Sequence, residues 1–265
     1  ADVGGFRHER HGLRIVDKIE KPRTRSPIIG LNLTLAVRDG IVNHCGEDRS
    51  TSISPSSPPE EPPQLQIGSL PCTLEGCVVR LVDKVAYLGR DVEDAIAVSL
   101  IDETEVPAEI SARIGTKNGE IVDYFVGNII ENSTETTISL SNGAAHLMQS
   151  LFEFNYERIY AHPMIASFKA RVEDVLEVLC ERFLKALTYY GDRTDLYMKQ
   201  DLNVIKILGK FVGDRKALYF GEECDLYDGD TERLHRRMAI DFLSTLTDSF
   251  VFQACRDYFL PPAIV

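Results

Sequence analysis

The stretch Val82–Asp91 (VDKVAYLGRD) places two carboxylates, an ammonium group and a phenol within ten residues of a predicted helix. At about 100° per residue, Asp83, Tyr87 and Asp91 lie along one stripe at i, i+4 and i+8. Lys84 lies beside that stripe, and the apolar residues around it indicate a helix that packs into a core. A carboxylate held against an apolar face needs a cation, a metal ion or several hydrogen bonds. The stretch therefore predicts a helical core that also carries a polar site.

Asp83 is the residue of this stretch that ordinary helix chemistry explains least. The acidic residues of 91–94 lie near a predicted helix start, where the helix dipole favours negative charge. Asp83 instead lies in mid-helix between Val79 and Ala86, which are apolar. A simple ion pair between Asp83 and Lys84 is not expected, because adjacent helical residues point about 100° apart. The residues alone leave a structural and a functional role open for Asp83.

Composition and charge limit the classes of protein that this chain can be. It has 265 residues, of which 44% are hydrophobic, so it can fill one large core or two small ones. Its formal net charge of −12 repels nucleic acid and anionic membrane, so we do not expect a nucleic acid partner. A polyanionic ligand must then be met by a local basic cluster or by a metal ion.

The sequence also predicts a cellular compartment. No apolar run approaches the roughly 18 residues that suggest a membrane span, and the start shows no signal-peptide pattern. The six cysteines, Cys45 among them, have neither CxxC pairs nor zinc-like spacing, which is typical of reduced structural thiols. We therefore expect a cytoplasmic protein without a membrane partner.

Helical patterns follow one another along the chain and predict an all-α fold. The expected helices are Phe6–Glu20, Leu33–Cys45 with Asn32 as its cap, Thr73–Leu88, Asp91–Leu100, Pro107–Ile114, Glu120–Asn132, Ala144–Tyr160, Ile165–Tyr190, Leu196–Val212 and Thr231–Tyr258. Only Thr136–Leu140 (TTISL) has strand character. The Ser/Pro-rich stretch 48–63 is too polar to bury much surface, so it predicts a flexible loop.

Several further residues have both a functional and a structural interpretation. His8 and His11 have the i, i+3 spacing that can chelate a metal ion on a helix. The basic run 233–237 can hold phosphates, although a solvated helix face explains it as well. The other four histidines have unrelated settings that favour surface or packing roles. They are His44, His146, His162 and His235.

Five segments in order resemble a known family, the HD-domain deoxynucleoside triphosphate triphosphohydrolases, which are the bacterial dGTPase-like enzymes. They are GGFRHERHGLRIVDKIE (4–20), GLNLTLAVRDGIVNHCGE (30–47), LEGCVVRLVDKVAYLGRDVEDAI (74–96), LFEFNYERIYAHP (151–163) and DFLSTLTDSF (241–250). The resemblance implies a multi-helical HD-domain fold with a helical C-terminal extension. We expect residues 1–135 to form the C-terminal part of the HD core, with a flexible loop at 48–70, and residues 136–265 to form a helical region packed on it.

The resemblance also implies roles for individual residues. Asp83 matches a metal-binding Asp at the head of the family's D-x-x-A-Y segment, and His8 matches a catalytic histidine near the reacting phosphate. Lys84 is implied to reach substrate phosphate, Tyr87 to line the sugar, and Asp91 to accept from the 3′-hydroxyl of the deoxyribose. A carboxylate, a point charge, a flat phenol and a hydrogen-bond acceptor suit these tasks.

The implied activity is hydrolysis of a dNTP, as of dGTP, to a deoxynucleoside and inorganic triphosphate. The implied cofactor is a divalent metal ion (Mg, Mn, Ni, Co or Fe), and the implied assembly is a homo-oligomer. The residues specify neither the base nor the metal.

The chain departs from the family's pattern in one serious way. The family's first metal-binding His, its His-Asp pair and the following His and Glu lie upstream of the G-G-F segment, and these 265 residues contain no His-Asp dipeptide. Two smaller departures are Phe242 and Ser249, where the family often has Tyr and Arg. We expect the complete protein to extend upstream and to carry the three missing ligands there. The alternative is a catalytically inactive HD-type nucleotide-binding or regulatory subunit.

Overall fold

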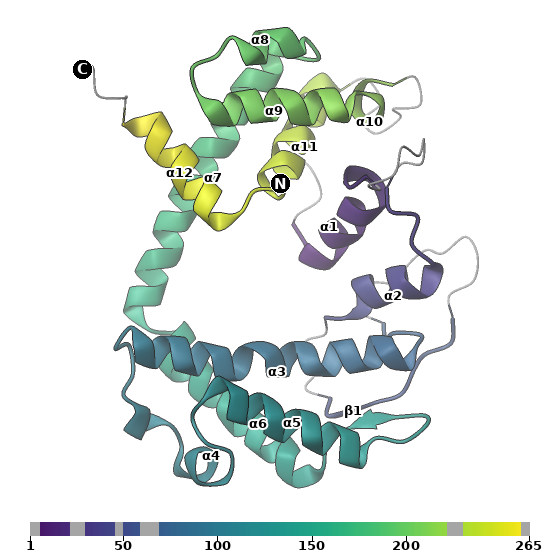
Figure 1. The fold of residues 1–265 in the computed structure, drawn as a ribbon, viewed down its shortest axis with the longest axis vertical. Helices are drawn as coiled ribbons and strands as arrows, with labels where there is room; N and C mark the ends of the chain where they lie inside the picture. The colour runs from purple at the N-terminus through teal and green to yellow at the C-terminus, as the bar shows by residue number, and fades with distance from the viewer. Residues whose placement is uncertain (1–5, 22–29, 46–49, 59–68, 222–229, 261–265) are drawn as a thin grey trace. The chain divides into compact units, whose positions relative to one another are not determined.

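A computed structural model describes residues 6–21, 30–45, 50–58, 69–221 and 230–260 (Figure 1). These residues form twelve α-helices and two short strands, which confirms the all-α prediction. The chain divides into two compact units. Of the described residues, the N-terminal unit comprises those within 7–17 and 31–167, and the C-terminal unit comprises 6, 18–21, 30 and those within 168–260. The predicted regions 1–135 and 136–265 stay a prediction.

Helix α3 (Leu74–Ala97) is the central element of the N-terminal unit. The Thr73 hydroxyl caps it by accepting from the Gly76 N–H at 3.0 Å. The predicted break between Leu88 and Asp91 is wrong, because the helix continues through Gly89. A Cβ at Gly89 would lie 3.0 Å from the Ile121 Cβ, so this glycine permits a close approach of two helices.

Helices α5 (Asn118–Asn132) and α6 (Asn142–Asn155) run beside α3 (Figure 1) and bury its apolar face. A 3₁₀ turn, η2 (Glu103–Glu105), and helix α4 (Ala108–Arg113) connect α3 to α5, and a π-helical segment, η3 (Tyr156–Tyr160), continues α6. The fully buried members of this core are Cys77, Leu81, Leu88, Val92, Ile110, Ile121, Phe125, Ala144 and Leu151. Their spacing along α3 is that of one face of a helix.

The two strands pair antiparallel within the N-terminal unit. Strand β2 (Ile138–Ser139) lies inside the stretch that has strand character in the sequence, and its partner is β1 (Ser52–Ile53). The predicted flexible loop is therefore ordered at β1, because Ile53 is an isolated apolar residue that is buried in the core. The part of that loop at 59–68 lies outside the described residues.

The first helices differ from prediction in their limits. Helix α1 (His8–Arg14) continues as a π-helical segment, η1 (Ile15–Ile19), and α2 spans Leu35–Asn43. The cap of α2 is Thr34, while Asn32 adopts a left-handed backbone conformation with φ of 51°. The Arg38 guanidinium donates to both carboxylate oxygens of Asp17 at 3.0 and 2.7 Å, which ties α2 to the first segment.

The C-terminal unit contains most of α7 (Pro163–Tyr190), and then α8 (Thr194–Met198), α9 (Asn203–Asp214), α10 (Lys216–Phe220), α11 (Thr231–Leu243) and α12 (Asp248–Phe259). The two long helices predicted over 196–212 and 231–258 are each two helices. The second division follows from capping, because the Thr247 hydroxyl accepts from the Phe250 N–H at 3.3 Å and starts a new helix. None of the described helices has the length and apolarity that crossing a membrane requires.

A buried polar network explains much of the basic run 233–237. The Tyr219 hydroxyl donates to the fully buried Asp241 carboxylate at 2.7 Å, and the Arg237 Nε lies 3.0 Å from the other carboxylate oxygen. Arg236 pairs with Glu232 one turn away, and His235 is buried, which lowers its pKa. These contacts favour the structural interpretation of the basic run.

Adjacent isoleucines on α5 provide a matched test of the core. Ile129 is 6% exposed, whereas Ile130 is 72% exposed. We expect Ile129→Ala to lower the free energy of unfolding by about 2–4 kcal/mol, because the buried cavity is not refilled. Ile130→Ala should change it by less than about 0.5 kcal/mol. Urea denaturation followed by circular dichroism measures both values, and equal losses would contradict the packing described.

Candidate functional site

The four predicted residues of the stripe all lie on α3, in the N-terminal unit. Asp83 is exposed, while Lys84, Tyr87 and Asp91 are half-buried. The apolar residues that flank Asp83 in the sequence do not bury it, because Val79 is 48% exposed and Ala86 is exposed as well. The core side of the helix is occupied by other residues, and this turns the Asp83 stripe outward.

Asp91 has a partner that sequence reasoning missed. The Tyr160 hydroxyl, at the end of η3, donates to the Asp91 Oδ2 at 2.5 Å across 69 residues of sequence. Burial raises the pKa of Tyr160 above its usual range, and the hydrogen bond to the Asp91 carboxylate raises it further. The buried Asn155 side chain donates to the Leu88 carbonyl at 3.0 Å and fixes η3 against α3. The only signal in the sequence is the position of Tyr160 in the LFEFNYERIYAHP segment.

Tyr87 lies between the two carboxylates of the stripe. Its ring packs edge-on against Phe152 of α6, with the ring centroids 5.9 Å apart. Burial raises the pKa of Tyr87, and the charges of Asp83, Asp91 and the Cys45 thiol raise it further. The structure therefore brings a residue of the loop after α2 to the stripe.

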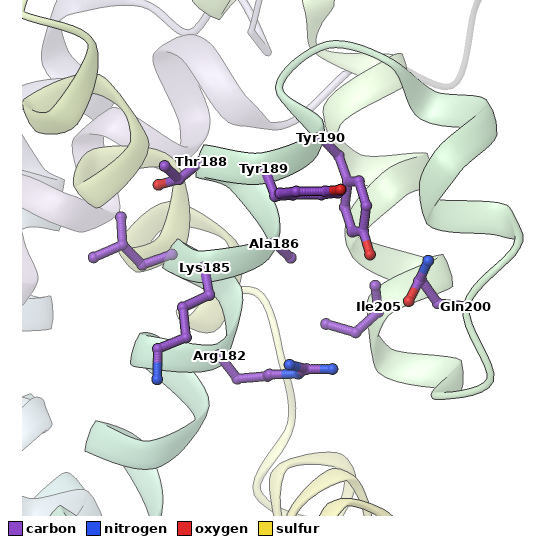
Figure 2. A pocket seen from close by; sticks show the side chains of 9 residues that line it. Arg182, Lys185, Ala186, Thr188, Tyr189, Tyr190, Gln200 and Ile205 are labelled. Atoms are coloured by element: carbon purple, nitrogen blue, oxygen red, sulfur yellow. The ribbon is translucent and has the colours of Figure 1, made fainter.

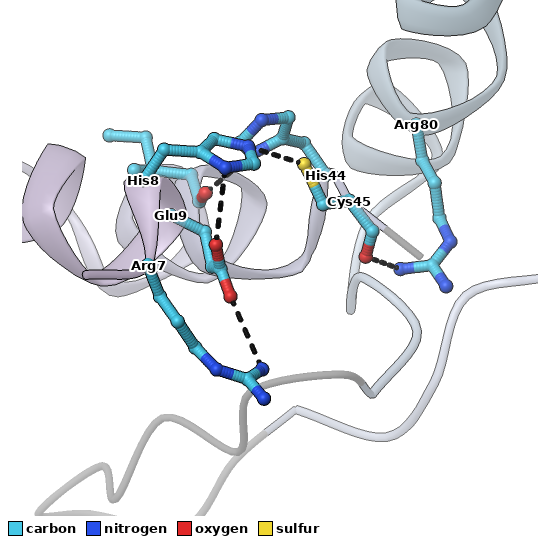
Figure 3. A network of polar contacts seen from close by, with 7 residues as sticks. Arg7, His8, Glu9, His44, Cys45 and Arg80 are labelled. Atoms are coloured by element: carbon cyan, nitrogen blue, oxygen red, sulfur yellow. Dashed lines mark hydrogen bonds and ion pairs between the residues drawn. The ribbon is translucent and has the colours of Figure 1, made fainter. Parts of the chain in front are cut away.

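That loop contributes a second group of polar side chains (Figure 3). The His8 Nε2 lies 2.8 Å from the Cys45 Sγ, and the His8 and His44 rings are 5.4 Å apart in an edge-to-face arrangement. The sequence spacing pairs His8 with His11 and favours a surface or packing role for His44. The structure places His11 in a buried position on α1 and brings His44 and Cys45 to His8 instead.

Cys45 connects this group to the stripe on α3. Burial raises the pKa of its thiol, and the nearby carboxylates of Asp83 and Glu9 raise it further, while the Arg80 guanidinium opposes them. Two groups that are separate in the sequence thus form one polar region. We take this region of the N-terminal unit as the candidate functional site.

Comparison with known proteins shows distant homologues of the chain. The chain is 27% identical over 259 residues to a deoxyguanosinetriphosphate triphosphohydrolase-like protein of Caldanaerobacter subterraneus, and this match covers 97% of the chain. It is 30% identical over 200 residues to a protein with the same description from Clostridium perfringens, which covers 73% of the chain. The chain is a distant homologue of the dGTP triphosphohydrolase-like family. This finding confirms the resemblance read from the sequence, although no protein-family model matches the chain.

The chain spans only part of these dGTP triphosphohydrolase-like relatives. The matches cover 59% of the Caldanaerobacter protein and 51% of the Clostridium protein. A 95-residue match to a relative from Syntrophus aciditrophicus reaches 39% identity and covers 36% of the chain. Residues outside the chain can therefore belong to the site of the whole protein.

The described residues do not complete the divalent metal site that the family implies. Asp83 offers one exposed carboxylate, and one carboxylate does not hold a catalytic ion tightly. Among the described residues, the only group of three possible metal ligands is His8, His44 and Cys45, and Asp83 is not a member. We therefore derive no catalytic step through an ion at Asp83.

A pocket of about 580 Å³ lies in the C-terminal unit, away from every predicted site residue along the chain. Figure 2 shows the side chains of Arg182 and Lys185 on one side and the Tyr189 and Tyr190 rings on another. Gln200 and Ile205 also line it, together with Leu184, Ala186 and Thr188. The Arg182 guanidinium also stacks over the Tyr258 ring at 5.6 Å from its centroid. This cation–π contact already engages the Arg182 side chain.

The Tyr160–Asp91 contact makes a pH-dependent contribution to stability. Because the folded state raises the pKa of Tyr160, this contribution is complete below the ordinary tyrosine value of about 10 and is lost as the pH rises beyond it. We expect Tyr160→Phe to lower the free energy of unfolding by about 1–3 kcal/mol at neutral pH. Denaturant unfolding at several pH values measures this difference, which should shrink in alkali.

The matched control is Tyr156→Phe, which removes an exposed phenol from the same segment. We expect that change to stay within about 0.5 kcal/mol. An equal effect of the two substitutions at neutral pH would show that the Asp91 contact stabilises nothing.

Proposed function

We propose that the full-length protein is a metal-dependent cytoplasmic phosphohydrolase that cleaves dNTPs to a deoxynucleoside and inorganic triphosphate. The observation that carries this proposal is the placement of Asp83, Lys84, Tyr87 and Asp91, one exposed and three half-buried, on one helix of a distant dGTP triphosphohydrolase-like homologue. His8 is linked to this helix through Cys45, because the His8 Nε2 lies 2.8 Å from the Cys45 Sγ and the charge of Asp83 raises the pKa of the Cys45 thiol. The proposed substrate is dNTP, and the preferred base stays unspecified.

The proposed sugar subsite consists of Tyr87 and Asp91. The Asp91 Oδ2 accepts from Tyr160, and a carboxylate has two oxygens with about four acceptor positions. Asp91 can therefore accept from a substrate hydroxyl while Tyr160 holds its orientation. Tyr160 is a positioning residue in this proposal, and Tyr87 offers the flat phenol against the deoxyribose.

The proposed phosphate subsite consists of Lys84 and His8. The Lys84 ammonium supplies a point charge for phosphate oxygens. The exposed His8 imidazole can contact phosphate or donate a proton to the leaving sugar oxygen. A divalent ion neutralises phosphate charge and polarises the phosphoryl group when it is bound. Asp83 is proposed as one of its ligands, with the remaining ligands on residues outside this chain.

The proposed partners follow from charge and from the resemblance. The net charge of −12 disfavours nucleic acid as a ligand, and a compact dNTP can still be met by local cations. The homo-oligomeric assembly and the cytoplasmic location stay predictions.

Asp83→Ala in the full-length protein tests the metal assignment. We expect the loss of more than about 100-fold in triphosphate release from dNTPs with divalent metal present, together with loss of bound metal. Asp94→Ala is the matched control, because Asp94 is an exposed carboxylate of the same helix that pairs with Arg90. Retained activity in Asp83→Ala would remove the role of Asp83. Nucleotide binding without triphosphate release by the unmutated protein would instead support an inactive regulatory subunit.

Asp91→Ala tests the 3′-hydroxyl contact. A hydrogen bond to a charged group contributes about 1.5–3 kcal/mol, so we expect KM for a dNTP to rise about 10-fold or more. KM for the 2′,3′-dideoxy analogue should change little, since it has no 3′-hydroxyl to bind. Steady-state kinetics with both nucleotides measures the two ratios, and equal ratios would remove this role from Asp91.

A further inference from the structure

Three side chains with metal-binding atoms converge where α1 begins and α2 ends. His8 is the first residue of α1, and His44 and Cys45 follow directly after α2. One ligand atom of each, a ring nitrogen from either histidine and the Cys45 Sγ, lies within 4.8 Å of the other two. Figure 3 shows the His8 ring between the Glu9 carboxylate and the Cys45 sulfur. The role proposed for His8 in hydrolysis uses neither His44 nor Cys45.

The second nitrogen of each histidine is already oriented. The His44 Nδ1 lies 2.7 Å from the Ile41 carbonyl oxygen, which can only accept, so Nδ1 carries the proton and Nε2 carries the lone pair. The His8 Nδ1 lies 3.5 Å from the carboxylate of Glu9, which is buried, while its Nε2 faces Cys45. Carbonyl and carboxylate partners of this kind orient metal-binding histidines in proteins.

A buried arginine, Arg80, holds the backbone of Cys45 in place. The Arg80 guanidinium is 2% exposed and donates to the carbonyl oxygens of Cys45 at 2.6 Å and Asn43 at 2.7 Å. These charge-assisted bonds fix the chain just after α2 and hold the Cys45 side chain toward His8. The Glu9 carboxylate, 3.5 Å from the His8 Nδ1, adds negative charge beside the three ligands, which favours a cation.

The separations suit a small soft ion after minor adjustment. Tetrahedral zinc places sulfur and nitrogen ligands about 3.6 Å apart, from bonds of about 2.3 and 2.1 Å. The His8 Nε2 and Cys45 Sγ are 2.8 Å apart and need to open by less than an ångström, on the order of a rotamer adjustment. Because His8 and His44 are not fully buried, their rings have room to make that movement.

We propose that His8, His44 and Cys45 bind a divalent cation of the zinc class, with a fourth position open to solvent or a ligand. Two imidazoles and a thiolate are soft donors that select zinc-like ions over magnesium. Binding releases the Cys45 thiol proton to solvent, and no other bond changes. None of these three residues is a metal ligand that the family resemblance implies, whereas Asp83 is.

Cobalt(II) substitution tests the proposal on the 265-residue chain itself. The purified, metal-free, reduced protein is titrated with Co²⁺ alone, and a thiolate-to-cobalt charge-transfer band is recorded in the near ultraviolet. We expect one equivalent of Co²⁺ to saturate the band and Zn²⁺ to abolish it by displacement. Absence of the band in the unmutated chain would overturn the proposal.

Variants then assign the ligands. Cys45→Ser should eliminate the band, and His44→Ala should weaken Co²⁺ binding at least tenfold. Cys255→Ser is the matched control, because Cys255 lies on α12 in the C-terminal unit, and it should leave the titration unchanged. Far-ultraviolet circular dichroism verifies that each variant is folded. A band that persists in folded Cys45→Ser would overturn the site. Because the assay uses no nucleotide, its failure leaves the proposed hydrolysis untouched.

Discussion

The N-terminal unit depends on the burial of one face of α3. Leu81, Leu88 and Val92 are fully buried there against residues of α5 and α6, and each such side chain contributes about 1.5–3 kcal/mol. A helix with one face buried in a core cannot rotate about its long axis without exposing that face. The opposite side, which carries Asp83, is consequently presented outward. The orientation of the candidate site is therefore a consequence of hydrophobic packing and not of the polar residues themselves.

Local chemistry was enough to predict part of this structure. The helical periodicity and the short strand at TTISL were both predictable because each depends on neighbouring residues. The continuity of α3 through Gly89 was not, because it depends on the approach of Ile121 from another helix. Tyr160 and His44 were missed for the same reason, since their partners are distant in sequence. The apolar pattern predicts one continuous helix over 231–258. The structure divides it into two, because Thr247 caps the start of the second.

The electrostatics of the region are unusual for a polyphosphate site. Glu9, Asp83 and Asp91 place several carboxylates around the proposed ligand position, in a chain that is already strongly acidic. Lys84 is the cation that the resemblance assigns to substrate phosphate, and Arg80 is committed to backbone carbonyls below the surface. A triphosphate therefore needs additional positive charge before it can approach these carboxylates. In the proposed function that charge would come from a metal ion whose ligands, apart from Asp83, are not among the described residues.

The two proposals compete for one atom. The imidazole of His8 has a single lone-pair nitrogen when it is neutral, and the contact with Glu9 leaves Nε2 as that nitrogen. An ion held by His8, His44 and Cys45 would occupy Nε2, so the same ring could not then accept or donate a proton at phosphate. Zinc-class ions and turnover would in that case exclude each other at His8, whereas an ion at Asp83 would not interfere. Cys45 controls whether His8 binds a zinc-class ion or acts on phosphate. Its thiolate is the ligand that makes the site of His8, His44 and Cys45 prefer a soft ion.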